Sequence, residues 1–277
     1  MSPRKLGYAC AVGSLFLGLS YLVAAEAPAR YLLINFSACL LGVCSVLALN
    51  RAQLNGRTIQ KWAMPVMSLS LLLTAFFGQQ AHGATRWIAI GPLLIQPSFV
   101  VLPLILVSFA AKPNRVTTAA VLISALAIAL QPDRGMAGAM TVALVSLAVL
   151  SANRFVFLGL ASSIVAFLVT LSRSDNLPAM PHVEHVLYSS FDVHPLIGVA
   201  VLCGSALLLL PGVLGVRTAG ADRSVCLVFA STWIALILAA ALGNYPTPVM
   251  GYSGAAVLGY VLSVGLLPDV ATRGAIK

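Results

Sequence analysis

The polar residues that could do chemistry gather between Arg173 and His194, in the stretch RSDNLPAMPHVEHVLYSSFDVH. This interval holds three of the seven acidic residues and three of the four histidines, namely Asp175, Glu184, Asp192, His182, His185 and His194. A carboxylate whose pKa is raised by apolar surroundings can act as a general base. The histidines and Glu184 are also zinc-type ligands, but His-x-Glu-His is not the helical H-E-x-x-H arrangement and no cysteine is near, so acid–base chemistry is the favoured interpretation.

The rest of the chain has the composition of a membrane protein. Hydrophobic residues make up 60% of the 277 positions, charged residues 8%, and the mean hydropathy is +1.00. Such a chain cannot hide its apolar surface in a soluble globule. The net charge of +9 therefore points to orientation in the membrane and not to nucleic acid. The five cysteines lie in apolar runs and predict neither a disulfide nor a metal site, and the first apolar segment lacks a convincing cleavage site and is read as a retained helix.

Ten apolar segments are candidates for membrane-spanning helices, and eight spans are the alternative, because the fourth and fifth segments are short. A span needs roughly 20 residues, and none of these segments alternates with the period of two typical of a barrel. We therefore expect an all-α polytopic bundle that forms one integral-membrane domain over residues 1–277. The expected helices cover about 6–25, 30–50, 62–80, 97–111, 116–131, 135–152, 155–172, 195–216, 223–243 and 250–270.

The basic residues predict the orientation of these helices. With the N- and C-termini cytoplasmic, cytoplasmic loops carry twelve of the sixteen Lys and Arg residues, as the positive-inside rule requires. The outer side carries only four basic residues. Arg30 lies at the short turn after the first helix, and Arg86, Arg134 and Arg173 lie in the outer loops, which are predicted at 81–97, 131–135, 173–194 and 244–249. The polar interval around Glu184 is thereby predicted to lie outside.

Three segments carry a family pattern. Residues 83–98, GATRWIAIGPLLIQPS, follow G-x-x-R-W-I-x-[LF]-G-x-x-x-x-Q-P-S-E up to its last position. LQPDRG at 130–135 is similar to L-Q-P-D-L-G, and PTPVMGYSGAA at 246–256 is similar to P-L-P-F-[IV]-S-Y-G-G-S-S. In this order the segments resemble the SEDS family, the FtsW, RodA and SpoVE proteins. The resemblance implies ten transmembrane helices in a bacterial cytoplasmic membrane and polymerisation of lipid II, a polyprenyl-diphosphate-linked precursor, on the outer face.

The resemblance also implies a catalytic residue. Residues 182–198 align without gaps with the family's H-[TS]-D-F-I-F-A-x-I-G-E-E-L-G-x-x-G, and the catalytic aspartate of the family falls on Glu184. The chain departs from the family at Phe99, where Q-P-S-E has its glutamate, and in the outer loop at 173–194, which has only about 22 residues.

Glycosyl transfer from a polyprenyl diphosphate needs a base and counter-charge for the departing diphosphate. Glu184 is the expected base. The expected substrate-binding residues are Arg86, Trp87, Gln96, Asp133, Arg134, Arg173 and His182. A divalent cation, Mg²⁺ or Mn²⁺, is the second source of counter-charge, and Asp133 would either orient one of the arginines or help to hold this cation. The simpler alternatives are an interfacial anchor for Arg86 and Trp87 and a surface ion pair for Asp133 and Arg134.

Two function classes remain open. The first is a SEDS-like glycosyltransferase that acts on the lipid-linked substrate beside a membrane transpeptidase, a penicillin-binding protein, among membrane lipids and without nucleic acid. The second is a non-catalytic relative that serves as a scaffold or regulator of cell-wall synthesis, which the Phe99 substitution and the short loop favour. The candidate helices are almost free of ionisable residues, which argues against an ion-coupled transporter.

Overall fold

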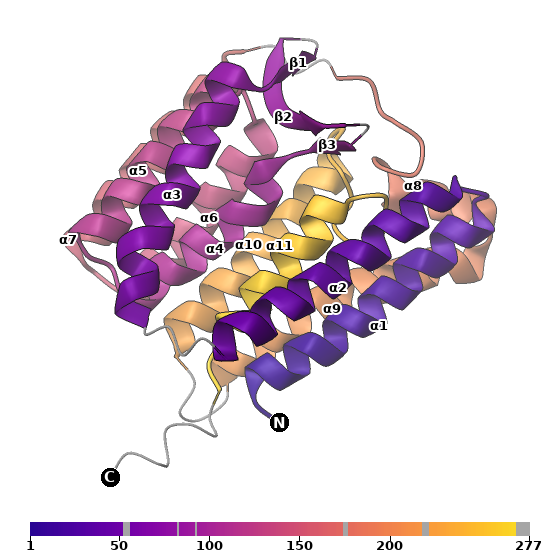
Figure 1. Cartoon of the computed structure of the whole chain (residues 1–277), viewed down its shortest axis with the longest axis horizontal. Helices are drawn as coiled ribbons and strands as arrows, with labels where there is room; N and C mark the ends of the chain where they lie inside the picture. The colour runs from indigo at the N-terminus through magenta and orange to yellow at the C-terminus, as the bar shows by residue number, and fades with distance from the viewer. Residues whose placement is uncertain (52–55, 82, 92, 174–176, 218–221, 270–277) are drawn as a thin grey trace.

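Helices make up most of the chain in the computed structural model, which describes residues 1–51, 56–81, 83–91, 93–173, 177–217 and 222–269. Within these residues there are eleven helices and three short strands. The helices are α1 Pro3–Ala24, α2 Ala29–Arg51, α3 Gly56–Phe77, α4 Pro97–Ala111, α5 Arg115–Leu130, α6 Arg134–Leu150, α7 Arg154–Leu171, α8 Val186–Val193, α9 Pro195–Arg217, α10 Arg223–Leu242 and α11 Gly254–Gly265. Figure 1 shows the long helices side by side in one bundle.

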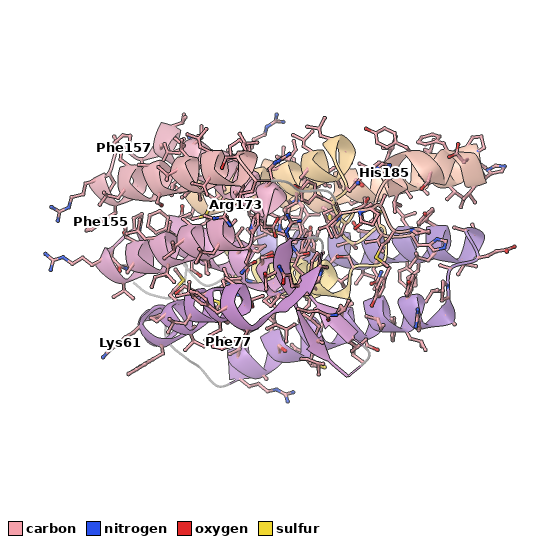
Figure 2. The ribbon with its side chains drawn as sticks, turned by 90° about the horizontal axis from the view of Figure 1, so that it is seen from above. Lys61, Phe77, Phe155, Phe157, Arg173 and His185 are labelled. Atoms are coloured by element: carbon pink, nitrogen blue, oxygen red, sulfur yellow. The ribbon has the colours of Figure 1, made fainter. Side chains whose placement is uncertain are left out.

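The expected membrane bundle is confirmed. Ten of the described helices fall on the ten predicted segments, and α8 is an additional short helix of 8 residues. Five of them, α1, α2, α7, α9 and α10, are long and apolar enough to cross a membrane, and five shorter apolar helices accompany them. Large apolar side chains cover the outside of the bundle, such as Phe157 of α7, which is 52% exposed and projects from the surface in Figure 2. This all-α chain is a polytopic membrane protein.

The core is apolar, and the polar groups of Trp233 and Tyr260 within it are hydrogen-bonded. The ring of Trp233 in α10 packs edge-on against that of Tyr260 in α11, with 5.0 Å between the ring centroids. The Tyr260 hydroxyl donates to the carbonyl of Leu208 in α9 at 3.0 Å, and Trp233 Nε1 donates to Ser263 Oγ at 3.3 Å. A buried hydroxyl or indole N–H without a partner would cost about 1–3 kcal/mol, so these bonds fix how α9, α10 and α11 pack together.

The two ends of the bundle differ in character. We call the end where α1 begins and α2 finishes the basic end, because it carries the basic residues at the predicted cytoplasmic helix termini. Its chain segments are held together by contacts such as Arg4 Nε to the carbonyl of Leu267, at 2.9 Å. The strands β1 to β3 and helix α8 lie at the opposite end in Figure 1, which we call the outer end.

The predicted loop at 81–97 is a small antiparallel sheet with the order β1-β2-β3, an addition to the predicted all-helical pattern. Its strands are β1 Gln79–Ala81, β2 Ala84–Ile90 and β3 Leu93–Ile95. The glycine at position 91 has a φ of +58°, a conformation that suits glycine and allows the tight reversal between β2 and β3. The strands are too short to show an alternation of apolar and polar residues from which they could be predicted. They place Arg86 and Trp87 of β2 over the helices.

The last helix starts later than predicted. The expected helix at 250–270 begins only at Gly254, and an irregular segment, residues 244–252, separates it from α10. We call residues 244–252 the bridging segment. Val249 within it has a φ of +67°, which a helix cannot contain, so the helix begins only after the chain has turned.

Candidate active site

Asp133 lies at the centre of a buried polar cluster at the outer end. It is fully buried and caps α6, because its Oδ1 accepts from the backbone N–H of Met136 at 3.2 Å. Its Oδ2 accepts from Gln96 Nε2 at 2.8 Å and from Ser98 Oγ at 3.5 Å. The family segments at 83–98 and 130–135 therefore meet at Asp133. A carboxylate with no exposure is not a surface ion pair, so that interpretation of Asp133 is wrong.

Arg86 of β2 belongs to the same cluster and is only 2% exposed. Its guanidinium donates to the backbone carbonyls of Gln131 and Pro132, in the turn between α5 and α6, and it lies 5.9 Å from the ring centroid of Tyr245. Gln131 in turn donates to the carbonyl of Leu71 in α3 at 2.7 Å. A buried arginine with these contacts joins the sheet to the helices, so Arg86 is not the interfacial anchor considered above.

Arg134 follows Asp133 directly in the sequence and contacts Arg173, which lies just past the end of α7. An Nη of Arg134 donates to the backbone carbonyl of Arg173 at 3.1 Å. Arg173 is exposed at the end of α7 and is labelled in Figure 2. This contact fixes the Arg134 guanidinium against the backbone of the segment that carries Arg173, so two cationic residues share this part of the surface, and positive charge favours the binding of an anion.

Glu184 lies in a tight turn just before α8. Its Oε2 accepts from the backbone N–H of Met180 at 2.7 Å, and its side chain is partly buried. Burial raises the pKa of the Glu184 carboxyl above its usual 4.5, while the backbone hydrogen bonds and the charge of His185 lower it by less. The net result is a carboxyl that holds its proton more strongly than an exposed one, as a general base near neutral pH requires.

Two histidines give this turn its shape. His182 and His185 have φ values of +64° and +60°, in the left-handed region that few residues other than glycine adopt. The His182 ring lies between Tyr21 of α1 and Tyr31 of α2, with ring centroids 6.5 Å and 6.4 Å away. His185 Nε2 lies 2.7 Å from Oδ1 of Asn244, at the start of the bridging segment.

The bridging segment connects the Glu184 turn with the Asp133 cluster. The backbone N–H groups of Thr247 and Tyr252 donate to the carbonyls of Val183 and His182, at 2.9 Å and 2.6 Å. At its other end the ring of Tyr245 packs on Arg86 and against Gly135, next to Arg134. The residues just before Glu184, and His185 just after it, are thus hydrogen-bonded to the bridging segment. The same segment contacts Arg86 through Tyr245.

This segment is recessed below the outer ends of the first two helices. The Asn35 side chain is fully buried, donates to the Gly251 carbonyl at 2.9 Å and accepts from the Ser253 N–H at 3.1 Å. Asn35 lies six residues into α2, which at 1.5 Å per residue is about 9 Å from the start of the helix. Gly251 fits there because a Cβ would lie 2.8 Å from the carbonyl oxygen of His182.

The structure thus groups the predicted residues into three neighbouring sets. Arg86, Gln96 and Asp133 are bonded within one cluster, Arg134 and Arg173 form a pair, and His182 and Glu184 share a turn. Trp87 is partly buried on β2, opposite Gln79 of β1. Asp175 lies outside the described residues. The two grooves described below lie in the half of the bundle toward the basic end, away from these three sets.

Sequence reasoning missed the residues that hold these sets in place, above all Asn35, Gln131 and Tyr245. Asn35 had a usable signal, since a lone amide in an apolar span must find a partner. Tyr245 had none, because an aromatic residue at a helix end is ordinary at a membrane interface.

Comparison with known proteins places this arrangement in a family. The sequence model of the FtsW/RodA/SpoVE family, described as cell cycle protein, matches residues 19–180, more than half of the chain. The chain belongs to the FtsW/RodA/SpoVE family. That match covers the Asp133 cluster and ends four residues before Glu184. Comparison with curated protein sequences gave no match.

Three solved structures share the fold over nearly the whole chain. The rod shape determining protein RodA of Thermus thermophilus is 22% identical, with a TM-score of 0.67 over 97% of this chain and 96% of that one. A mutant of the same protein gives 21%, a TM-score of 0.68 and the same coverage. A chain of a peptidoglycan synthase complex in which polymerization and crosslinking are coordinated gives 19% and 0.61, over 93% of this chain and 94% of that one.

Proposed function

We propose that this chain is a membrane glycosyltransferase that polymerises lipid II, or a closely related polyprenyl-diphosphate-linked precursor, on the outer face of a bacterial cytoplasmic membrane. The observation that carries the proposal is the Glu184 carboxyl, which is partly buried, has a raised pKa and is fixed in a turn at the outer end. Family membership and the family-like fold support the reaction class.

Glu184 acts as the general base in this proposal. It takes the proton from the acceptor sugar hydroxyl as that oxygen attacks the anomeric carbon of the donor. The bond from the anomeric carbon to the diphosphate oxygen breaks, a glycosidic bond forms, and polyprenyl diphosphate leaves with the electron pair. The energy comes from the diphosphate ester, so no nucleotide is needed.

Arg134 and Arg173 are the proposed ligands of the diphosphate. Arg173 is exposed and Arg134 partly exposed at the outer end, whereas Arg86 is buried and donates its hydrogen bonds to the turn between α5 and α6. Arg86, Gln96 and Asp133 accordingly position the site, and Trp87 and His182 border it. Asp133 is fully buried and holds Gln96 and the first turn of α6, so the proposal gives it a positioning role and not that of metal ligand.

A divalent cation would therefore depend mainly on the substrate for its ligands. Mg²⁺ is often held by one or two carboxylates together with substrate phosphates. The described residues contain no group of three or more His, Cys, Asp or Glu side chains that could hold a metal ion. Mg²⁺ or Mn²⁺ would add counter-charge to the diphosphate beside Arg134 and Arg173.

A membrane transpeptidase is the proposed partner. A strand made on the outer face must be crosslinked there, and one of the family-like solved chains comes from a complex in which polymerization and crosslinking are coordinated. A polymerase that hands its product directly to a transpeptidase gains effective concentration for the second step.

One observation favours the second candidate, a non-catalytic scaffold. Phe99, in place of the family glutamate, is 3% exposed and packs in the apolar core beside Ser98, so this part of the family pattern serves packing here. Such a protein would keep the helical bundle and bind partners without forming glycan.

The deciding experiment is polymerisation of labelled lipid II by the purified protein, with and without a cognate transpeptidase. We expect glycan polymer from the wild type and none from Glu184→Gln. The matched control is Asp192→Asn, which removes an exposed carboxylate from α8 eight residues away and should keep activity. Equal polymer from Glu184→Gln would remove Glu184 as the base, and no polymer under any condition would favour the scaffold.

A further inference from the structure

A groove between α1 and α2 lies in the half of the bundle opposite the candidate active site. It has a volume of about 280 Å³ and its floor is formed by α11. The groove exists because α2 packs mainly on α11 and touches α1 much less. Its walls are apolar and include Val12 of α1, Val43, Val46 and Leu47 of α2, and Val261 of α11.

The groove opens toward the basic end, between two cations. Tyr8 and Val12 line it from α1, and Lys5 precedes them by one and two helical turns on the same face. Leu47 and Asn50 line it from α2, and Arg51 is the last residue of that helix. Lys5, Asn50 and Arg51 are all exposed, so the mouth of the groove is positively charged and can donate hydrogen bonds.

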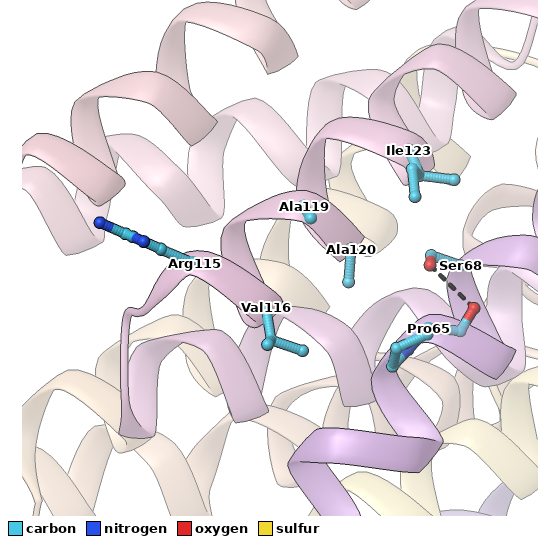
Figure 3. Close-up of a pocket in the computed structure, with 7 residues that line it drawn as sticks. All are labelled: Pro65, Ser68, Arg115, Val116, Ala119, Ala120 and Ile123. Atoms are coloured by element: carbon cyan, nitrogen blue, oxygen red, sulfur yellow. Dashed lines mark hydrogen bonds between the residues drawn. The ribbon is translucent and has the colours of Figure 1, made fainter.

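A second groove of about 280 Å³, between α3 and α5, lacks these features. Figure 3 shows that its cation, Arg115, extends away from the other lining residues. Its hydroxyl is already paired, because Ser68 Oγ donates to the carbonyl of Pro65 at 3.0 Å. In the first groove Tyr8 lines the apolar wall, and its hydroxyl is buried beside Gly265 of α11.

We propose that the groove between α1 and α2 is a binding site for an anionic phospholipid. One acyl chain lies along the apolar walls, and the phosphate group lies between Lys5 and Arg51, within reach of the Asn50 amide. Since the charge pattern predicts the basic end to be cytoplasmic, the lipid comes from the inner leaflet. This site is separate from the proposed glycosyl transfer and does not depend on it.

The preference for an anionic lipid rests on charge, because any acyl chain finds the same apolar surroundings in the bilayer. Each Lys or Arg near an anionic surface contributes about a fivefold gain in binding. Two cations at the mouth therefore predict a preference of about ten- to thirtyfold over a zwitterionic lipid of the same chain length. High salt should weaken the preference, because both cations are exposed.

Photo-crosslinking in vesicles tests the proposal. The purified full chain is reconstituted with phosphatidylglycerol or phosphatidylcholine that carries a diazirine in one acyl chain, and labelled peptides are quantified by mass spectrometry. We expect the phosphatidylglycerol probe to label the α1 and α2 peptides at least fivefold more than the phosphatidylcholine probe. The groove between α3 and α5 should show no such difference.

Charge variants complete the test. Lys5→Gln with Arg51→Gln should bring phosphatidylglycerol labelling down to the phosphatidylcholine level, and Arg115→Gln, the matched control, should leave it unchanged. If the double variant is poorly produced, the single variants Lys5→Gln and Arg51→Gln replace it, and each should lose part of the phosphatidylglycerol labelling. Equal labelling by both probes, or crosslinks between two copies of this chain through α1 and α2, would overturn the proposal.

Discussion

At Gly18 the first helix, α1, contacts the bridging segment. The substitution Gly18→Ala should lower activity far more than it lowers stability. A Cβ at position 18 would lie 2.5 Å from the Val249 carbonyl oxygen and 3.0 Å from Met250 Cα. Both neighbours are backbone atoms, which cannot swing aside as a side chain does. To restore an ordinary contact of 3.4 Å, the bridging segment must move by about 0.9 Å.

The two consequences of this movement have different sizes. Overpacking costs about 1–3 kcal/mol, and alanine returns up to about 1 kcal/mol through its better helix propensity, so the net loss of stability is about 0–2 kcal/mol. A displacement near 1 Å at a catalytic site can cost on the order of a hundredfold in rate. Because Thr247 and Tyr252 hold the turn that contains Glu184, we expect activity to fall far more than stability.

Lipid II polymerisation and thermal unfolding in detergent measure the two effects. Gly13→Ala in the same helix is the matched control, since its Cβ would meet only the flexible end of Leu207, at 3.3 Å. That variant should keep wild-type activity and unfold at the same or a slightly higher temperature. If Gly18→Ala kept full activity, or Gly13→Ala lost as much, the bridging segment would not position the site.

Three further predictions concern single side chains. Because burial raises the Glu184 pKa, this carboxyl binds its proton more strongly in the folded chain; the acid limb of the activity profile should lie above pH 4.5, with activity lost as the pH falls through the raised value, and an acid limb at or below 4.5 would contradict this. Asp133→Ala removes a helix cap and one of the two acceptors of the Gln96 amide, so it should cost about 2–4 kcal/mol in chemical denaturation, whereas Asp133→Asn, which can still cap α6, should cost clearly less; equal losses would refute the capping role. Asn35→Ala leaves the Gly251 carbonyl and the Ser253 N–H without their partner and should lower stability by about 2–3 kcal/mol, against almost no change for the exposed Ser20→Ala, and a neutral Asn35→Ala would show that other groups satisfy that backbone.

The helices could be predicted because each one repeats a simple physical requirement. In lipid every backbone group must be paired within its own segment, so an apolar run predicts a helix almost without regard to its neighbours. The predicted helix at 97–111 agrees to the residue with α4, whose first residue is Pro97. Proline suits that position because the N–H it lacks would have had no partner inside the helix.

The hydrogen-bond pairing of the irregular parts could not be predicted, because their backbone partners come from distant parts of the chain. Residues 244–249 were expected as a loop, but residues 250–253 were expected as helix and are irregular instead, because Asn35 and the Glu184 turn supply their hydrogen bonds. Strand β2 likewise depends on partners in β1 and β3. Local sequence does not contain these pairings.

The sequence indicated which residues form the site, but not which of them are buried and which are exposed. The family pattern selected Arg86, Gln96 and Asp133, yet an exposed arginine and a buried one read alike in a sequence. The structure separates them by burial: Arg86 and Asp133 are inside, and Arg173 is outside. Roles that depend on access to a substrate are therefore assigned only after the fold is known.

The recessed bridging segment has a consequence for how the chain assembles in the membrane. An unpaired backbone group in hydrocarbon costs several kcal/mol, so the hairpin of α10 and α11 cannot rest stably in lipid while residues 244–252 lack partners. Those partners, Asn35 of α2 and the carbonyls of His182 and Val183, are synthesised earlier in the chain. The final hairpin must therefore enter beside helices already inserted, and truncation of α1 and α2 should leave it unstable and open to membrane proteases.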